Sequence, residues 1–173
     1  MDKMYDLVLM IVPALIVFAG MFFFLKLFFE NETKRRMIEM KSNVRELVTP
    51  IQLQAYERMV LLLERISPYQ LIVRVNKNGW SSRHFHVELI AAIRSEFEHN
   101  LSQQIYMTPA AWDQIVSAKE ETIKIVNIAS MKVAENSPST ELAQAIIDVT
   151  SSLKKTPTAL AIEFVKREVA QKF

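Results

Sequence analysis

The chain has 173 residues, half of them hydrophobic, which suffices for one domain with a single hydrophobic core. It carries 21 lysines and arginines against 19 acids, and residues 49–173 carry 14 against 13, a balance that disfavours nucleic-acid binding because it leaves no broad basic surface. Cysteine is absent and glycine occurs twice, so disulfide and thiolate chemistry are excluded and phosphate-binding loops are disfavoured.

The N-terminal region predicts a transmembrane helix. Residues 7–25 contain no charged side chain, and the apolar character continues past Lys26 to residue 29. A helix of this length spans about 28 Å, close to the thickness of the hydrocarbon layer. A cleaved signal peptide would instead show a basic start, a shorter apolar stretch and small residues at its end. We therefore expect residues 1–30 to anchor the chain in the lipid bilayer with a single pass.

Basic residues follow the predicted span. The positive-inside rule then places the N-terminus outside and the C-terminal domain in the cytoplasm. Four of these cations are expected to lie at the membrane interface, where each contributes about 1 kcal/mol beside anionic headgroups. They are Lys26, Lys34, Arg35 and Arg36.

Residues 31–48 predict a basic amphipathic helix next to the membrane. Apolar residues recur here at alternating spacings of three and four, which is an a/d pattern of about two heptads. Packing on the chain's own domain is the favoured use of this pattern, and a homodimer through residues 37–51 is the alternative. The pattern consists of Met37, Met40, Val44, Leu47 and Ile51.

Pairs of serine or threonine with proline punctuate the cytoplasmic domain, residues 49–173. A hydroxyl at the N-cap accepts a hydrogen bond from the first helical turn, and proline suits the first helical position. Five such pairs predict helix starts at Pro50, Pro68, Pro109, Pro138 and Pro157. We expect an all-α fold, with one transmembrane helix followed by a compact bundle of about five to six helices. The predicted bundle segments are 50–66, 68–75, 82–104, 109–135, 138–154 and 157–171.

Residues 50–66 predict the core helix of the bundle. At 100° per residue, its apolar side chains fall on one arc about 200° wide, and charged side chains take the other side. Leu61 alone lies among the charges. It is either a tolerated exposed leucine or a contact point.

No catalytic, nucleotide-binding or metal-binding motif occurs, so we expect no enzyme activity, no cofactor and no metal site. His84 and His86 would point about 200° apart on a helix and cannot share one ion. His86 is expected to be a hydrogen-bonded core residue, and Glu96 is expected to form a structural ion pair. The alternative is a membrane-tethered enzyme with a pocket involving His86, Glu96 or His99.

One stretch departs from the even mixing of charge. No acid occurs between Glu64 and Glu88, whereas basic residues and a tryptophan do. A basic loop with an exposed tryptophan can bind anionic lipid or an acidic partner, although a solvated loop is the simpler interpretation. The candidate binding residues in this stretch are Arg74, Lys77, Trp80 and Arg83.

The stretches IQLQAYERMVLLLERISP at residues 51–68 and EFEHNLSQQIYMTPAAW at residues 96–112 resemble an uncharacterised family of small bacterial membrane-anchored proteins. The resemblance implies a similar topology, in the bacterial inner membrane, and assigns no activity. In the second stretch, Gln103, Gln104 and Tyr106 form either a polar recognition surface or a turn that orders the next helix. Because catalytic motifs are missing and the chain carries a predicted anchor, we expect a non-enzymatic adaptor or accessory subunit that binds another protein at the cytoplasmic face.

Overall fold

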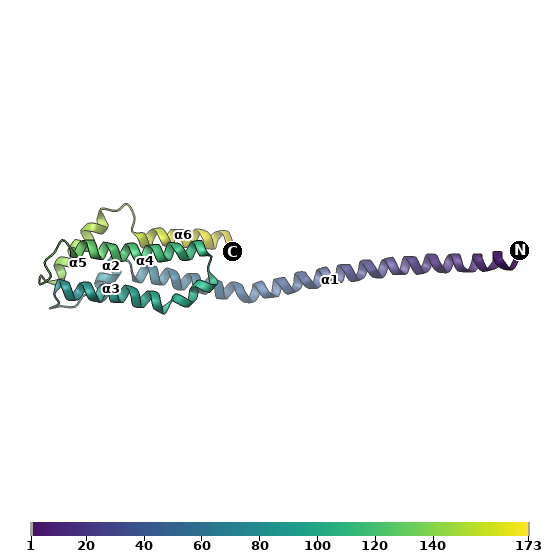
Figure 1. Cartoon of the computed structure of the whole chain (residues 1–173), viewed down its shortest axis with the longest axis horizontal. Coiled ribbons are helices and arrows are strands. Elements are labelled where there is room, and N and C mark those ends of the chain that lie inside the picture. The colour runs from purple at the N-terminus through teal and green to yellow at the C-terminus, as the bar shows by residue number, and fades with distance from the viewer. Residues whose placement is uncertain (1, 173) are drawn as a thin grey trace. The chain divides into compact units, whose positions relative to one another are not determined.

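The computed structural model describes the backbone of residues 2–172, and the side chains of these residues except 2–14, 38–39 and 41–47. The described chain is all-α, as predicted, and its only extended pairing is an isolated bridge between Ser81 and Pro138. Figure 1 shows the helices in chain order. They are α1 (Asp2–Arg65), α2 (Pro68–Val75), α3 (Ser82–His99), the 3-10 helix η1 (Leu101–Tyr106), α4 (Pro109–Ser130), α5 (Ser139–Ser151) and α6 (Pro157–Lys172).

The chain divides into two units, Met1–Thr49 and Pro50–Phe173. The first unit contains α1 up to Thr49, and the second contains the end of α1 and all later helices. Within the residues whose side chains the structure describes, no helical segment is both long enough and apolar enough to cross a membrane. The predicted span begins at residue 7, and the side chains of its residues 7–14 lie outside the described part. In the predicted 37–51 seam, the side chains of Val44 and Leu47 also lie outside it.

The prediction of a helix start at Pro50 is wrong, because α1 continues through this residue to Arg65. A proline inside a helix removes one backbone hydrogen bond and crowds the preceding turn. The apolar arc that follows offsets this cost by burial in the core of the second unit. Thr49 is therefore not an N-cap, and the helix predicted at 31–48 is part of α1. The fully buried members of the arc are Ala55, Tyr56, Met59, Leu62, Leu63 and Ile66.

The other four pairs do mark helix starts, in one case shifted by a residue. Helices α2, α4 and α6 begin at Pro68, Pro109 and Pro157, as predicted. Helix α5 begins at Ser139 instead of Pro138. Pro138 is extended because it joins the bridge to Ser81, and its carbonyl accepts a hydrogen bond from the Ser82 hydroxyl at 3.0 Å.

Three helices end earlier than predicted. Helix α3 ends at His99, because the buried Asn100 side chain donates a hydrogen bond to the Glu96 carbonyl at 2.9 Å and η1 follows. An asparagine side chain competes in this way for the last carbonyls of a helix. Helix α4 ends at Ser130, five residues before the predicted end at 135, and helix α5 ends at Ser151, three residues before the predicted end at 154.

Thr108 is a true N-cap. Its hydroxyl oxygen accepts a hydrogen bond from the Ala111 backbone N–H at 3.2 Å, and the hydroxyl donates to the Glu168 carboxylate at 2.8 Å. Replacing Thr108 by alanine should lower the free energy of unfolding of the full chain in detergent by about 0.5–2 kcal/mol. Thr49→Ala removes the same hydroxyl inside α1 and should change this free energy by less than about 0.5 kcal/mol. Equal losses in urea titrations of the two variants would contradict the assignment.

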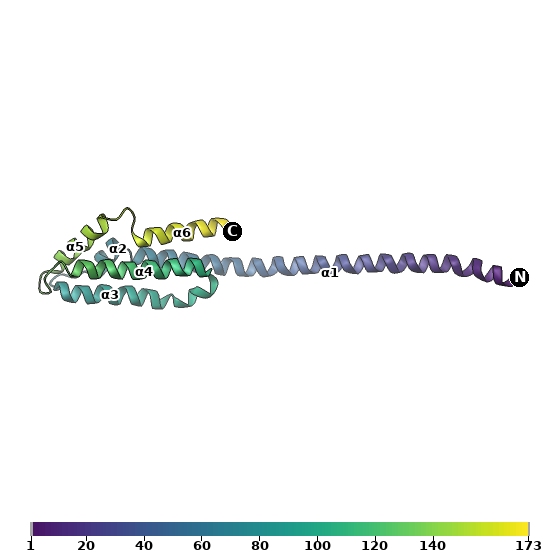
Figure 2. The ribbon, with the colours of Figure 1, turned by 45° about the horizontal axis from the view of Figure 1, so that its top comes forward.

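The core of the second unit lies between the end of α1 and helices α2–α6. Figures 1 and 2 both show α3 beside α4, and α6 running next to α4 toward the end at which α1 enters the unit. The predicted arc of residues 50–66 is confirmed over its central turns, whereas Ile51 and Leu53 are partly exposed. Leu61 is 61% exposed, as its place among charged residues predicts.

Candidate functional site

The arginines of the predicted basic surface are paired with acids from distant parts of the sequence. Arg74 in α2 lies 3.4 Å from a Glu96 carboxylate oxygen, and Arg65 at the end of α1 lies 2.5 Å from the same oxygen. Arg83 at the start of α3 lies 2.8 Å from Glu135. The basic stretch contains no acid of its own, but acids from other parts of the chain lie beside its arginines.

Trp80 is half-buried, whereas a basic loop with an exposed tryptophan was predicted. Its ring packs against the core and meets the His84 ring edge-to-face at 4.4 Å, with the Lys77 ammonium 5.2 Å from its centre. Its carbonyl accepts a hydrogen bond from the Ser139 backbone N–H at 3.0 Å. Gly79 has φ 85°, a conformation that favours glycine, and allows the turn. The loop is thus joined to the start of α5.

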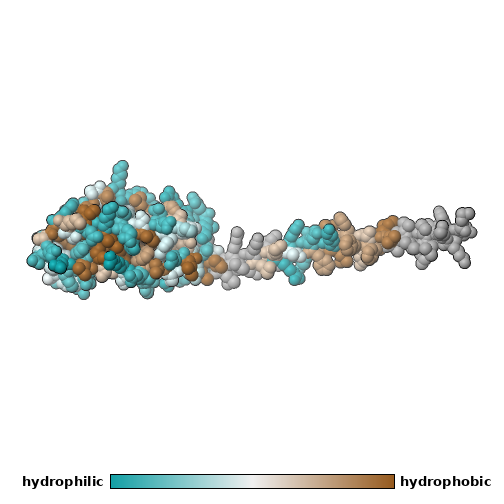
Figure 3. Space-filling model, in the orientation of Figure 1, coloured by the Kyte–Doolittle hydropathy of each residue, from teal (hydrophilic) through white to brown (hydrophobic). Residues whose placement is uncertain are grey.

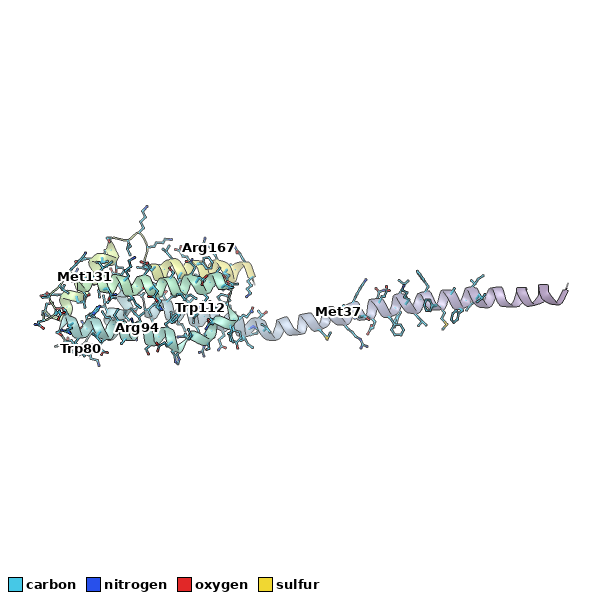
Figure 4. All side chains as sticks on the ribbon, in the orientation of Figure 1. Met37, Trp80, Arg94, Trp112, Met131 and Arg167 are labelled. Atoms are coloured by element: carbon cyan, nitrogen blue, oxygen red, sulfur yellow. The ribbon has the colours of Figure 1, made fainter. Side chains whose placement is uncertain are left out.

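The polar residues of η1 lie at the other end of α3. Gln104 is exposed, whereas Gln103 and Tyr106 are half-buried. Helix α3 has 18 residues, so its ends are about 27 Å apart. Figure 4 shows Trp80 at one end of the second unit and Trp112, near η1 in sequence, at the other. The predicted binding residues therefore form two separate groups.

The residues of the predicted enzyme pocket are divided in the same way. Glu96 and His99 line one cavity of about 360 Å³, and His86 lines another of about 180 Å³ near the start of α3. The His86 Nε2 lies 2.8 Å from the Asn127 side-chain oxygen, so His86 is hydrogen-bonded as predicted, but it is half-buried and not part of the core. Hydrogen bonding from Arg65 lowers the pKa of Glu96, and the predicted ion pair is confirmed. A general acid needs a raised pKa instead.

The predicted membrane-interface residues are exposed on α1 in the first unit. Lys26, Lys34 and Arg35 are exposed, and Arg36 forms an ion pair with Glu32 at 2.9 Å. Figure 3 shows a brown, apolar surface along the described part of α1 that precedes these residues and a teal, hydrophilic one where the basic residues follow. Among described residues, no group of three histidine, aspartate or glutamate side chains could hold a metal ion.

Helices α1 and α6 form a groove that the sequence reasoning missed, which we call the α1–α6 groove. Its volume is about 570 Å³ and its lining is mostly apolar. The buried Tyr56 hydroxyl donates to Glu168 of α6, and burial together with this hydrogen bond raises the pKa of Tyr56 to about 12. The only signal in the sequence was Leu61 among charged residues. The lining is Leu53, Tyr56, Glu57, Val60, Leu61, Val165, Lys166, Val169 and Ala170.

A second missed groove, the α4–α5–α6 groove, has a volume of about 390 Å³. Its charged rim is internally paired, since Lys124 lies 3.5 Å from Glu121 and Lys155 lies 2.5 Å from Glu163. No sequence pattern predicts it, because its position depends on how the α5–α6 connection crosses α4. Its apolar lining is Ala118, Ile125, Ile128, Val149, Leu153 and Leu160.

The chain matches the model of a family of unknown function, DUF7935, over residues 2–172. No curated protein and no solved structure matches it. The predicted resemblance to an uncharacterised family is confirmed, and the match assigns no activity.

Proposed function

We propose that this chain, which belongs to the DUF7935 family of unknown function, is a membrane-anchored adaptor or accessory subunit without enzymatic activity. It is held by residues 1–30 in the inner membrane of a bacterium, with its N-terminus outside. Residues 49–173 form its cytoplasmic domain and bind another protein. The α4–α5–α6 groove is the observation that carries this proposal.

The sequence and the exposure of α1 support the anchor. Residues 7–25 are uncharged, and every described large apolar side chain from Leu15 to Phe29 is at least 42% exposed. Exposing so many apolar side chains to water is unfavourable. A bilayer accepts a helix of this kind, because its backbone groups are already hydrogen-bonded. The cations that follow support a cytoplasmic domain.

The α4–α5–α6 groove supports a protein partner that inserts a short apolar segment. Its floor is apolar, and the charges on its rim already form ion pairs within the chain. A charged ligand would therefore have to compete with these ion pairs for its own counter-charge. An apolar centre within a polar rim is the usual composition of a protein–protein interface. Ile128 and Leu160 are partly exposed there and available for contact.

The arrangement of the candidate catalytic residues supports a non-enzymatic role. His86 is apart from Glu96 and His99, and the Glu96 carboxylate is engaged by two arginines. General acid–base catalysis needs its groups within hydrogen-bonding reach of one substrate. The three candidate residues of the alternative enzyme pocket do not line one cavity, so they do not meet this requirement together.

The test is recovery of a partner with variants of the groove. Full-length chain with a C-terminal tag is crosslinked in native membranes, purified and analysed by mass spectrometry. Ile128→Asp and Leu160→Asp should each reduce recovery of the specific partner by at least about tenfold, because a carboxylate then faces an apolar partner surface. Val73→Asp makes the same change at an 80% exposed position of α2 and should retain the partner. Full recovery with both groove variants would reject this groove as the docking site.

A further inference from the structure

We infer that the α1–α6 groove binds the same groove of a second copy of this chain, with Glu57 of each copy opposite Lys166 of the other. The inference names a second partner and a surface separate from the α4–α5–α6 groove. The inference rests on the proposed function in one respect. Two chains anchored in the same membrane must run in the same direction where they leave it.

The two walls of the groove carry opposite charges. Glu57 on α1 and Lys166 on α6 are both exposed, and neither forms a hydrogen bond or ion pair within the described part of the chain. An anionic ligand would meet Glu57, and a cationic ligand would meet Lys166. The surface that satisfies both has an apolar centre with the same two charges in reversed order. A second copy related by a two-fold axis offers that surface.

Charge pairing also selects the orientation of the two copies. Figures 1 and 2 show α6 running alongside residues 50–65 of α1 in the opposite direction. A two-fold axis along the groove lays α1 of one copy over α6 of the other, which brings Glu57 and Lys166 together twice. An axis across the groove lays α1 over α1 and sets like charges against each other. Along the groove, both copies of residues 50–65 run in the same direction, as two chains anchored in one membrane require.

Pairing accounts for the exposed leucines of α1. Leu53 and Leu61 lie one helical turn before and after Glu57 on the same face, and they are 39% and 61% exposed. In the pair, α6 of the second copy covers them with Val169 and Ala170, which line the groove and are not buried. The 37–51 seam lacks such complementarity, since a parallel pair would set Arg36 at a g position against Lys41 at an e position of the other chain.

Charge reversal in the full-length chain tests the pair. Cysteine is absent, so Met131→Cys, at an 84% exposed position far from the groove in sequence, gives a single site for donor or acceptor dyes. Energy transfer between labelled chains in detergent micelles, followed on dilution, reports the dissociation constant. Glu57→Lys and Lys166→Glu should each raise this constant by at least about tenfold, because two like-charge contacts replace two opposite ones. The double variant should restore it, and so should an equimolar mixture of the two single variants.

The controls are Glu141→Lys on α5 and Lys132→Glu after α4, which make the same charge changes outside the groove and should leave energy transfer unchanged. Single variants that pair as tightly as the wild type would overturn the inference, and so would a mixture that fails to recover. The inference would also be overturned if the wild type is monomeric and binds a fluorescent fatty acid that the Leu61→Asp variant does not bind. That result would assign the groove to an acyl chain. Because micelles need no native membrane or partner, failure here leaves the proposed function standing. Failed membrane fractionation or partner recovery, in turn, leaves the pair standing.

Discussion

Replacing Val17 and Phe18 by arginine is expected to release the chain from the membrane. Both residues lie near the middle of residues 7–29, and both side chains are exposed. An arginine at the centre of a membrane helix costs about 2.5–3.5 kcal/mol on insertion scales, so two cost about 5 kcal/mol or more. The inserted fraction should fall by more than about a thousandfold relative to the soluble fraction. Immunoblots of carbonate-washed membranes and of the soluble fraction measure the change.

Tyr69→Arg with Val73→Arg is the matched control, since it adds the same two charges at exposed positions of α2. This variant should stay in the membrane fraction. Orientation is read in the same strains by a reporter fused to the C-terminus, which should be active in the cytoplasm. If the Val17 and Phe18 variant resists carbonate as the wild type does, residues 7–29 are not the anchor.

Truncating Tyr56 to alanine is expected to destabilise the second unit by about 3–5 kcal/mol, because the change leaves a cavity where a buried ring stood. Tyr56 is 1% exposed, and its hydroxyl joins α1 to Glu168 of α6. Thr108 donates to the same carboxylate from the start of α4. Urea titration of the full chain in detergent, followed by circular dichroism, measures the loss. Tyr69→Ala, at an exposed tyrosine of α2, should change the free energy of unfolding by less than about 0.5 kcal/mol.

Tyr56→Phe keeps the ring and isolates the hydroxyl. A hydrogen bond to a charged carboxylate contributes about 1.5–3 kcal/mol, and the variant should lose that amount at neutral pH. The folded state raises the Tyr56 pKa from 10.0 to about 12, so the stabilisation is fully present below pH 10. It is lost as pH rises from 10 through 12, because the unfolded tyrosine ionises first. The stability difference between wild type and Tyr56→Phe should therefore be constant below pH 10 and shrink above it. A difference that grows with pH would contradict the proposed state of this hydroxyl.

Local patterns in the sequence predicted much of the fold. Capping by Thr108 and Thr156 and a proline at the first helical position, as at Pro68, involve only the next few residues. These signals predicted three helix starts to the residue. The apolar arc of residues 50–66 follows from helical periodicity alone, and it predicted the core face of α1. The same local reading failed at Pro50, because burial of the following turns outweighs the local cost of a proline inside the helix.

The sequence by itself determined the all-α fold, most helix starts and the separation of Leu61 from the core, because each depends on residues within a few helical turns. Only the tertiary structure decided where the charges of the basic stretch go. Arg74 meets Glu96 and Arg83 meets Glu135, which are 22 and 52 positions away in sequence. It also decided that α1 and α6 leave an apolar groove with opposite charges on its walls. Such pairings depend on how helices far apart in the chain cross one another, and a single helix's periodicity specifies its buried face but not the helix that will cover it.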